Sequence, residues 1–163
     1  MLELRHRHRL RRKEIRKLAD ELEASLGVRT FSEDDAVDMA EAGDFQVILM
    51  GNQALAILTE RGPFLTVRGL LRWPPARRFV SVDEGAIRFI CNGADVMGPG
   101  IVEVDSAIRE GELVWVRDVK HLKPLAIGRA LVAAGMMASR SPGKAVRTLH
   151  YVGDELWNIG SQK

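Results

Sequence analysis

Two consecutive prolines, Pro74 and Pro75, separate two parts of the sequence that differ in character. Proline has no amide hydrogen and fixes φ, so a proline pair ends any helix or inner strand that reaches it. Longer apolar patterns precede the pair, whereas short β-rich runs separated by glycine follow it. Arg77 and Arg78 come next, and exposed charged connectors are typical of domain boundaries. The sequence therefore predicts an α+β protein with a small N-terminal domain over residues 1–76 and a second domain over residues 77–163.

The first part begins with an extended segment and one strongly periodic helix. If residues 2–10 are extended, the leucines and histidines alternate with the arginines, so that Arg5, Arg7 and Arg9 share one face of a strand. Over residues 11–26 apolar residues recur three or four positions apart, so they share one face of a helix. Gly27 follows and is a suitable C-terminal stop. The apolar stripe consists of Ile15, Leu18, Leu22 and Leu26.

Further elements are predicted between residue 32 and the proline pair. Ser32 is followed by three acidic residues, which favours a helix start because the helix dipole stabilises carboxylates there, and Gly43 would end this helix. A Gly51-Asn52 turn joins two apolar runs in a predicted hairpin. A short helix is expected within residues 64–73, with Leu65, Leu70 and Leu71 facing inward. The hairpin strands are Phe45–Met50 and Ala54–Thr59.

The second part consists of short β-rich runs interrupted by one helix. Asp83 is the expected cap of a helix over residues 84–91. Many short strands with regular turns favour a small closed barrel. The expected strands are Phe79–Val82, Ile101–Val104, Leu113–Val119, Pro124–Val132, Arg147–Val152 and Leu156–Ile159.

Charge is distributed unevenly, although the net charge is only +2. Residues 1–17 carry eight Arg and Lys against two acids, whereas residues 18–60 carry ten acids against Arg29 alone. A basic arm favours polyanionic partners such as nucleic acid. Two roles stay open: contacts with RNA phosphates, or neutralisation of the acidic segment over residues 33–44. The arm residues expected to contact phosphates are Arg5, Arg7, Arg9 and Arg12.

A glycine-rich loop over residues 92–100 carries the most specific pattern in the chain. Its sequence motif resembles the signature loop of the PUA domain, an RNA-binding pseudo-barrel. The motif reads Gly93-Ala94-x-Val96-x-x-Pro99-Gly100-Ile101. Further stretches over residues 79–160 are similar to the same family, among them Gly111-Glu112-Leu113-Val114 and Pro124-Leu125-Ala126-Ile127-Gly128-Arg129-Ala130. The resemblance implies a PUA-type β pseudo-barrel for residues 77–163.

Two other stretches resemble the malignant T-cell-amplified (MCT) translation factors, in an archaeal-type form. They are His150-Tyr151-Val152-Gly153-Asp154-Glu155-Leu156-Trp157 and Gly62-Pro63-Phe64. This resemblance implies an RNA-binding protein that acts in translation. We expect a cytoplasmic protein because Cys91 is the single cysteine, and a non-catalytic one because the first 75 residues are too short for most RNA-modifying catalytic domains. Its implied partners are structured RNA (tRNA or ribosomal RNA), the small ribosomal subunit and a translation initiation factor, with no membrane contact.

The resemblance also implies an RNA site on the second domain's helix and glycine loop. Backbone amides, a helix terminus and basic side chains would hold phosphates there. Unpaired nucleotides would contact the apolar side chains. The implied site residues are Gly85, Arg88, Asn92, Gly93, Ala94, Asp95, Val96, Met97, Pro99, Gly100, Lys144 and Arg147.

The remaining patterns exclude several other classes. Cys91 is the single cysteine, so neither an intramolecular disulfide nor a cysteine-rich zinc site is expected. No nucleotide-binding or hydrolase motif is present, and we expect no cofactor, no metal and no catalytic residue. His6 and His8 are interpreted as polar or surface side chains rather than metal ligands. The alternative function is an adaptor that brings a partner factor or an RNA-modifying enzyme to structured RNA.

Overall fold

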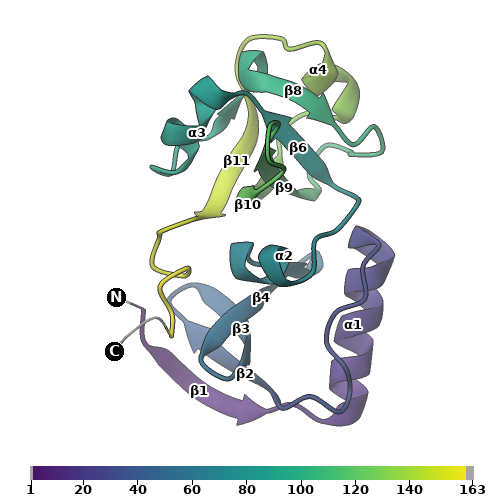
Figure 1. Ribbon diagram of the computed structural model, residues 1–163. Helices are drawn as coiled ribbons and strands as arrows, with labels where there is room; N and C mark the ends of the chain where they lie inside the picture. Colours follow the sequence, from purple (N-terminus) through teal and green to yellow (C-terminus); the bar gives the residue numbers. More distant parts are fainter. Residues whose placement is uncertain (1, 161–163) are drawn as a thin grey trace. The chain divides into compact units, whose positions relative to one another are not determined.

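The computed structural model describes residues 2–160 of the 163-residue chain. These residues divide into two compact units (Figure 1). The first unit contains the residues up to Ala76 together with the segment from Glu155 onward, and the second unit is Arg77–Asp154. The sequence-based division placed residues 155–163 in the second domain, so the structure differs from it at this end of the chain.

The first unit is built on an antiparallel meander of five strands in the order β1-β2-β3-β4-β5. Successive residues of β3 and β4 are buried, and successive residues of a strand point to opposite faces, so this part of the sheet is covered on both sides. The strands are β1 (Leu4–Arg9), β2 (Val37–Ala42), β3 (Phe45–Met50), β4 (Gln53–Thr59) and β5 (Gly62–Leu65).

Two helices, α1 (Arg12–Leu26) and α2 (Val67–Arg72), pack against this sheet. The apolar stripe of α1 is buried as its spacing predicts, and Gly27 ends the helix in a left-handed conformation with φ of 74°. Helix α2 is shorter than predicted because Gly62–Leu65 forms β5 instead. Its Leu71 is 50% exposed, so the prediction that Leu71 faces inward is wrong.

The predicted helix from Ser32 to Gly43 is wrong, since β2 occupies most of this segment. Ser32 does act as a cap, but for a turn: its Oγ accepts the amide of Asp34, and its own amide donates to the Asp35 carboxylate. The same side-chain geometry serves helix starts and such turns. Strand β2 then pairs with β1 on one side and β3 on the other, which satisfies its backbone without a helix.

The second unit contains a curled six-stranded sheet in the order β7-β11-β10-β9-β6-β8, with β6 and β9 parallel. An α+β fold with a barrel-like second part is thus confirmed. Helices α3 (Glu84–Ile90) and α4 (Ala134–Ala138), the latter not predicted, and the 3₁₀ turn η1 (Gly98–Gly100) complete the unit. The strands are β6 (Phe79–Val82), β7 (Val96–Met97), β8 (Ile101–Val104), β9 (Leu113–Asp118), β10 (Pro124–Ala130) and β11 (Lys144–Tyr151).

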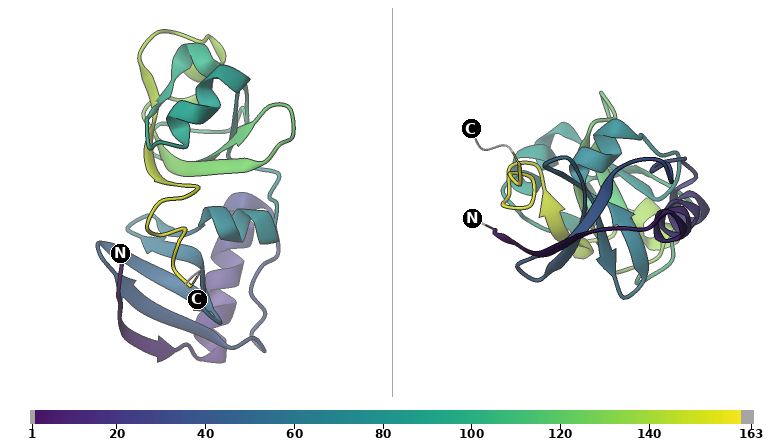
Figure 2. Two further views of the ribbon diagram at one scale, coloured as in Figure 1. Left: turned by 60° about the vertical axis from the view of Figure 1, so that its left-hand side comes forward. Right: turned by 90° about the horizontal axis from the view of Figure 1, so that it is seen from below.

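The segment after Asp154 packs with the first unit and is not a strand, contrary to the prediction for Leu156–Ile159. Figure 2 shows this yellow segment beside the first-unit sheet. Leu156 and Ile159 are buried, and the Arg68 guanidinium lies 3.8 Å from the Trp157 ring centroid while its Nε donates to the Trp157 carbonyl. A turn rather than a strand lets both apolar side chains face inward three residues apart.

Helix α2 approaches β4 so closely that only glycine fits at position 69. A Cβ there would lie 2.0 Å from the Leu55 carbonyl oxygen. We expect Gly69→Ala to lower the free energy of unfolding by about 1–3 kcal/mol, despite alanine's better helix propensity. Gly135→Ala in α4 is the matched control, because a Cβ there meets nothing within 4 Å. It should leave stability unchanged or raise it by up to about 1 kcal/mol in urea unfolding. Equal effects of the two changes would contradict the close-packing explanation.

Candidate nucleic-acid interface

A groove of about 790 Å³ lies on the second unit between α3, the glycine loop and the start of β11. Asp83 fixes the start of α3 against this loop. Its Oδ1 accepts the Ala86 amide at 3.1 Å, and its own amide donates to the Gly100 carbonyl at 3.0 Å. The predicted cap is therefore confirmed, and it ties helix and loop into one wall. The groove is lined by Asp83, Gly85, Ala86, Phe89, Ile90, Gly93, Ala94, Asp95, Val96, Met97, Pro99, Gly100 and Lys144.

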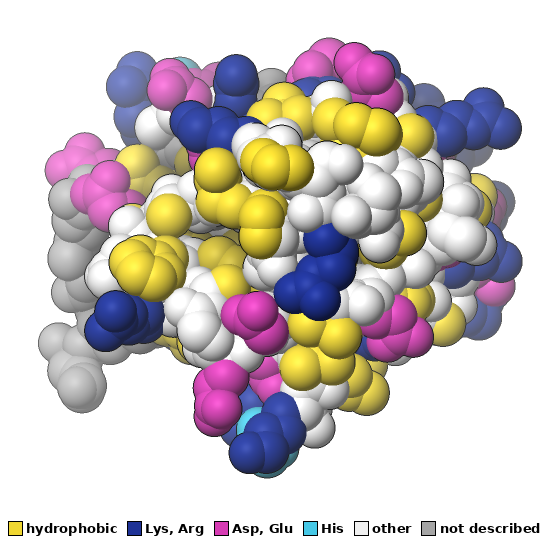
Figure 3. Space-filling view, turned by 90° about the horizontal axis from the view of Figure 1, so that it is seen from above, with side chains coloured by type: hydrophobic (Ala, Val, Ile, Leu, Met, Phe, Trp, Pro, Cys, Tyr) yellow, Lys and Arg dark blue, Asp and Glu magenta, His cyan; other side chains and the backbone are white. Residues whose placement is uncertain are grey.

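Two large apolar side chains in the groove are exposed. Phe89 is 54% exposed and Met97 is 47% exposed. Seen from above in Figure 3, hydrophobic side chains reach the surface in several places, with Lys and Arg side chains among them. Sequence reasoning singled out Met97 but missed Phe89. The signal was available, because Phe89 falls outside the inward stripe formed by Ala86, Ile87 and Ile90.

The glycine loop offers fewer free amides than its composition suggests. The amides of Asn92 and Ala94 donate to the Phe89 carbonyl, and those of Gly93 and Gly98 donate to the carbonyls of Ile90 and Gly143. These four groups are therefore engaged within the protein. The prediction that backbone amides of the loop bind phosphates can therefore apply only to amides other than these four.

Close packing explains two of the loop glycines. At Gly98 a Cβ would lie 1.8 Å from the Ser141 carbonyl oxygen, so no other residue fits without backbone movement. At Gly93 φ is 91°, and a Cβ would lie 3.0 Å from the Tyr151 ring. Glycine at these positions holds the loop against β11 and the segment before it.

The charged side chains near the groove are partly compensated. Lys144 Nζ lies 3.1 Å from an Asp95 carboxylate oxygen, and the Thr148 amide donates to Asp95 Oδ1 at 2.9 Å. The hydrogen bond from the Thr148 amide, followed by Lys144 and then the charge of Arg147, holds the pKa of Asp95 below its usual value against the opposing effect of burial. Arg140 donates to the Pro99 carbonyl at 2.6 Å.

Nine of the twelve implied site residues line this groove together, while Arg88, Asn92 and Arg147 do not. Arg88 is exposed, and its guanidinium lies 5.0 Å from the Phe89 ring centroid, so its charge is beside the groove. Arg147 is exposed on β11. The lining members are Gly85, Gly93, Ala94, Asp95, Val96, Met97, Pro99, Gly100 and Lys144.

The basic arm is largely paired within the first unit. Arg7 and Arg9 donate to the two oxygens of Asp38 at 2.7 and 2.6 Å. Because β1 bulges between Arg5 and His8, with φ of 55° at His6, the simple alternation predicted for the arm is interrupted.

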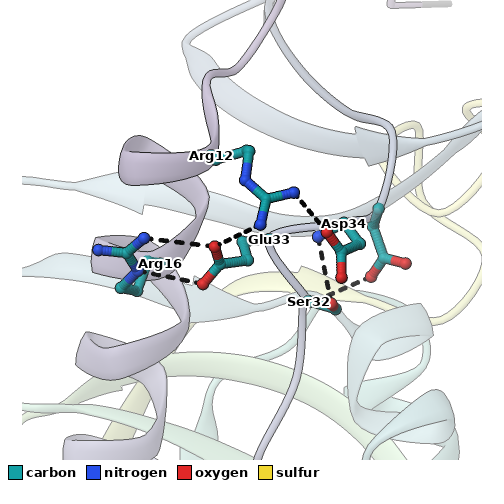
Figure 4. A network of polar contacts seen from close by, with 6 residues as sticks. Arg12, Arg16, Ser32, Glu33 and Asp34 are labelled. Carbon is teal, nitrogen blue, oxygen red and sulfur yellow. Dashed lines mark hydrogen bonds and ion pairs between the residues drawn. The ribbon is translucent and has the colours of Figure 1, made fainter.

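A second network of ion pairs joins α1 to Glu33 and Asp34 in the turn after Ser32 (Figure 4). Arg12 binds both Glu33 and Asp34, and Arg16 binds Glu33. The pKa of Glu33 is lowered chiefly by its hydrogen bond from Arg16, and that of Asp38 chiefly by Arg9. Among residues 2–160, no carboxylate partner is found for Arg5. The ion pairs therefore support the neutralising role for three of the four arm arginines.

Three further features bear on metal binding, membrane crossing and the single cysteine. Within the described residues there is no cluster of three or more His, Cys, Asp or Glu side chains placed to hold a metal ion. No helix among residues 2–160 has the length and apolar character needed to cross a bilayer. Cys91 is half-buried and packs against the core of the second unit, and burial raises the pKa of its thiol.

The pairing of Asp95 predicts a pH-dependent contribution to stability. Since its pKa is lower in the folded protein, the ionised carboxylate stabilises the fold above the unfolded-state pKa of about 3.9. This stabilisation is lost as the pH falls through the lower folded-state pKa. We expect Asp95→Asn to lower the melting temperature at pH 7 and to have progressively less effect as the pH falls below about 4. A difference in melting temperature that stays constant from pH 7 to pH 2 would contradict this role.

Comparison with known proteins places this geometry in a family. The PUA domain model matches residues 78–152. An uncharacterised protein of Methanocaldococcus jannaschii is 38% identical over 97% of this chain and 99% of its own length. Translation machinery-associated protein 20 of Eremothecium gossypii is 30% identical over 70% of this chain and 66% of its own length. Malignant T-cell-amplified sequence 2 of Mus musculus is 28% identical over 79% of this chain and 74% of its own length.

A solved structure shows the same fold. A conserved PUA domain protein from Thermoplasma acidophilum superimposes with a TM-score of 0.80 at 30% identity, over 93% of this chain and 97% of that one. The chain therefore belongs to a family of PUA-domain proteins that includes these archaeal relatives and is homologous to the malignant T-cell-amplified and translation machinery-associated proteins.

Proposed function

We propose that the chain binds structured RNA through the groove of its PUA domain and acts in translation as a non-catalytic, cytoplasmic factor. The observation that carries the proposal is the groove itself, in which exposed Phe89 and Met97 stand beside the cationic side chains of Arg88 and Lys144. Unpaired bases stack on such aromatic surfaces, and cations at the rim attract the phosphates.

The hydrogen bonds made by the loop amides determine which groups can bind phosphates. Because four of them donate within the protein, side chains supply most of the attraction for phosphates. Arg88, Lys144 and Arg147 are the residues we assign to this role, with Asn92 as a polar contact at the loop tip. Few base-specific donors line the groove, so recognition depends on RNA shape and unpaired nucleotides.

Replacement of the rim cations tests the site. Arg88→Glu combined with Lys144→Glu should weaken binding to a tRNA by at least about tenfold, or roughly 1.4 kcal/mol, in filter binding. Phe89→Ala should produce a similar loss without a change of charge, because stacking of one base contributes about 1–3 kcal/mol.

Arg61→Glu combined with Arg109→Glu is the matched control, since both are exposed and neither lines the groove. It changes the net charge by the same amount and should affect binding less. Equal losses for the two pairs, or unchanged affinity of the folded groove variants, would reject the site.

We further propose that the protein contacts the small ribosomal subunit and tRNA during initiation or recycling. The similarity to translation machinery-associated protein 20 supports a role in translation. Purified protein should sediment with purified small subunits without other factors. The adaptor alternative predicts that it sediments only when a partner protein is added. Because Glu33, Asp34 and Asp38 are paired with arginines, less acidic surface is left for the partner protein that the adaptor alternative requires.

For the arm, we propose that Arg7, Arg9 and Arg12 mainly neutralise the acidic segment, while Arg5 is available to a phosphate. Replacement of these four residues by glutamine should lower the melting temperature, because the ion pairs are lost. The slope of log K against log salt should change by no more than one phosphate contact, about 0.7–0.9. A slope reduced by about 2–4 with an unchanged melting temperature would instead assign the whole arm to RNA. Lys13→Gln with Lys17→Gln, both exposed on α1, is the control for general charge effects.

A further inference from the structure

The turn between β9 and β10 forms a rigid, exposed tip, Val119–Lys123, which we call the basic tip. Asp118 is buried, and its carboxylate accepts the amides of His121 and Lys123. The backbone closes the same turn, since the Leu122 amide donates to the Asp118 carbonyl and the Asp118 amide to the Lys123 carbonyl. A carboxylate that accepts several amides inside a turn fixes the turn's shape.

The side chains of the basic tip point to solvent and do not serve the core. All five residues are exposed, Val119 by 37% and Leu122 by 51%. Leu122 has φ of 58°, a left-handed conformation that an ordinary side chain adopts at a cost. An exposed leucine held in this conformation contributes little to stability, so its presentation points to a contact outside the chain.

The basic tip lies next to the groove. The Val119 amide donates to the Val82 carbonyl at 3.0 Å, and Val82 directly precedes Asp83, which lines the groove and caps α3. Figure 1 shows the turn between β9 and β10 beside the start of α3. An RNA strand that leaves the groove at this end would meet the basic tip.

The charge of the basic tip suits a phosphate backbone. Lys120, His121 and Lys123 offer hydrogen-bond donors, and neither lysine has a carboxylate within ion-pair distance among residues 2–160. Asp118, two residues before Lys120, faces its own turn, and Asp83 and Glu84 stand at the start of α3. The two lysines thus carry uncompensated charge.

We propose that the basic tip is a second RNA contact, which binds the phosphates of a duplex stem adjacent to the unpaired nucleotides in the groove. The inference rests on the proposed function of the groove. A rigid tip matches a duplex, whose phosphates are themselves held at fixed spacing, and RNA duplexes are recognised through shape and backbone. Lys120 and Lys123 contact phosphates, while Leu122 and Val119 pack against sugars at the stem's edge.

Two RNA probes test the proposal: a short unpaired oligonucleotide, and the same oligonucleotide attached to a duplex stem of about one helical turn. For Lys120→Gln with Lys123→Gln, affinity for the stem-bearing probe should fall at least about fivefold, and its salt slope should shrink by about 1.4–1.8. Affinity for the unpaired probe should stay unchanged. Leu122→Gly, which removes the side chain and relieves the left-handed strain, should weaken only the stem-bearing complex and leave the protein folded.

Arg61→Gln with Arg109→Gln removes the same charge at two exposed residues that belong neither to the basic tip nor to the groove lining, and should leave both affinities nearly unchanged. If the parent protein binds both probes and the tip variants bind the stem-bearing probe as tightly as the parent does, the basic tip is not an RNA contact. Equal losses for the two probes would likewise overturn it. If the parent binds neither probe, the proposed function of the groove fails, and the role of the basic tip fails with it.

Discussion

The close contact between η1 and the segment before β11 holds the groove of the second unit in shape. The Gly98 amide donates to the Gly143 carbonyl, Arg140 donates to the Pro99 carbonyl, and the backbone at Gly98 leaves no room for a side chain. From this contact β7 pairs with β11, which brings Asp95 to Lys144. The Asp83 cap fixes the opposite wall through Gly100. A groove built from backbone contacts can present Phe89 and Met97 to solvent without collapsing over them.

Local signals in the sequence predicted the elements whose causes are local. The stripe on α1, its stop at Gly27, the hairpin at Gly51 and the Asp83 cap each depend on residues within one or two turns, and each is present. The glycine loop was predictable for a different reason, since its sequence motif is specific to the family. Where two structures share one local signal, as with the turn at Ser32, the pairing of β2 with β1 and β3 decided the outcome.

The distribution of charge along the chain did not decide between the two roles that it left open for the basic arm. The arm and the acidic segment are opposite in sign, and the fold places Arg7, Arg9 and Arg12 directly on carboxylates 21 to 31 residues away along the chain. Such long-range pairs leave no pattern in the spacing of residues. Phe89 was missed because an aromatic residue is usually assigned to the core, although its position outside the stripe of Ala86, Ile87 and Ile90 indicated a surface residue; it is 54% exposed beside Arg88.

The return of the chain after Asp154 has a consequence for biosynthesis. The first unit obtains Leu156 and Ile159 from the last part of the described chain, whereas the second unit is a single continuous stretch. During synthesis domains generally fold in the order in which they emerge. Here all the residues of the second unit are available before those of the first, although the first begins earlier. The N-terminal sheet therefore keeps part of its apolar surface uncovered until the segment after Asp154 has been synthesised.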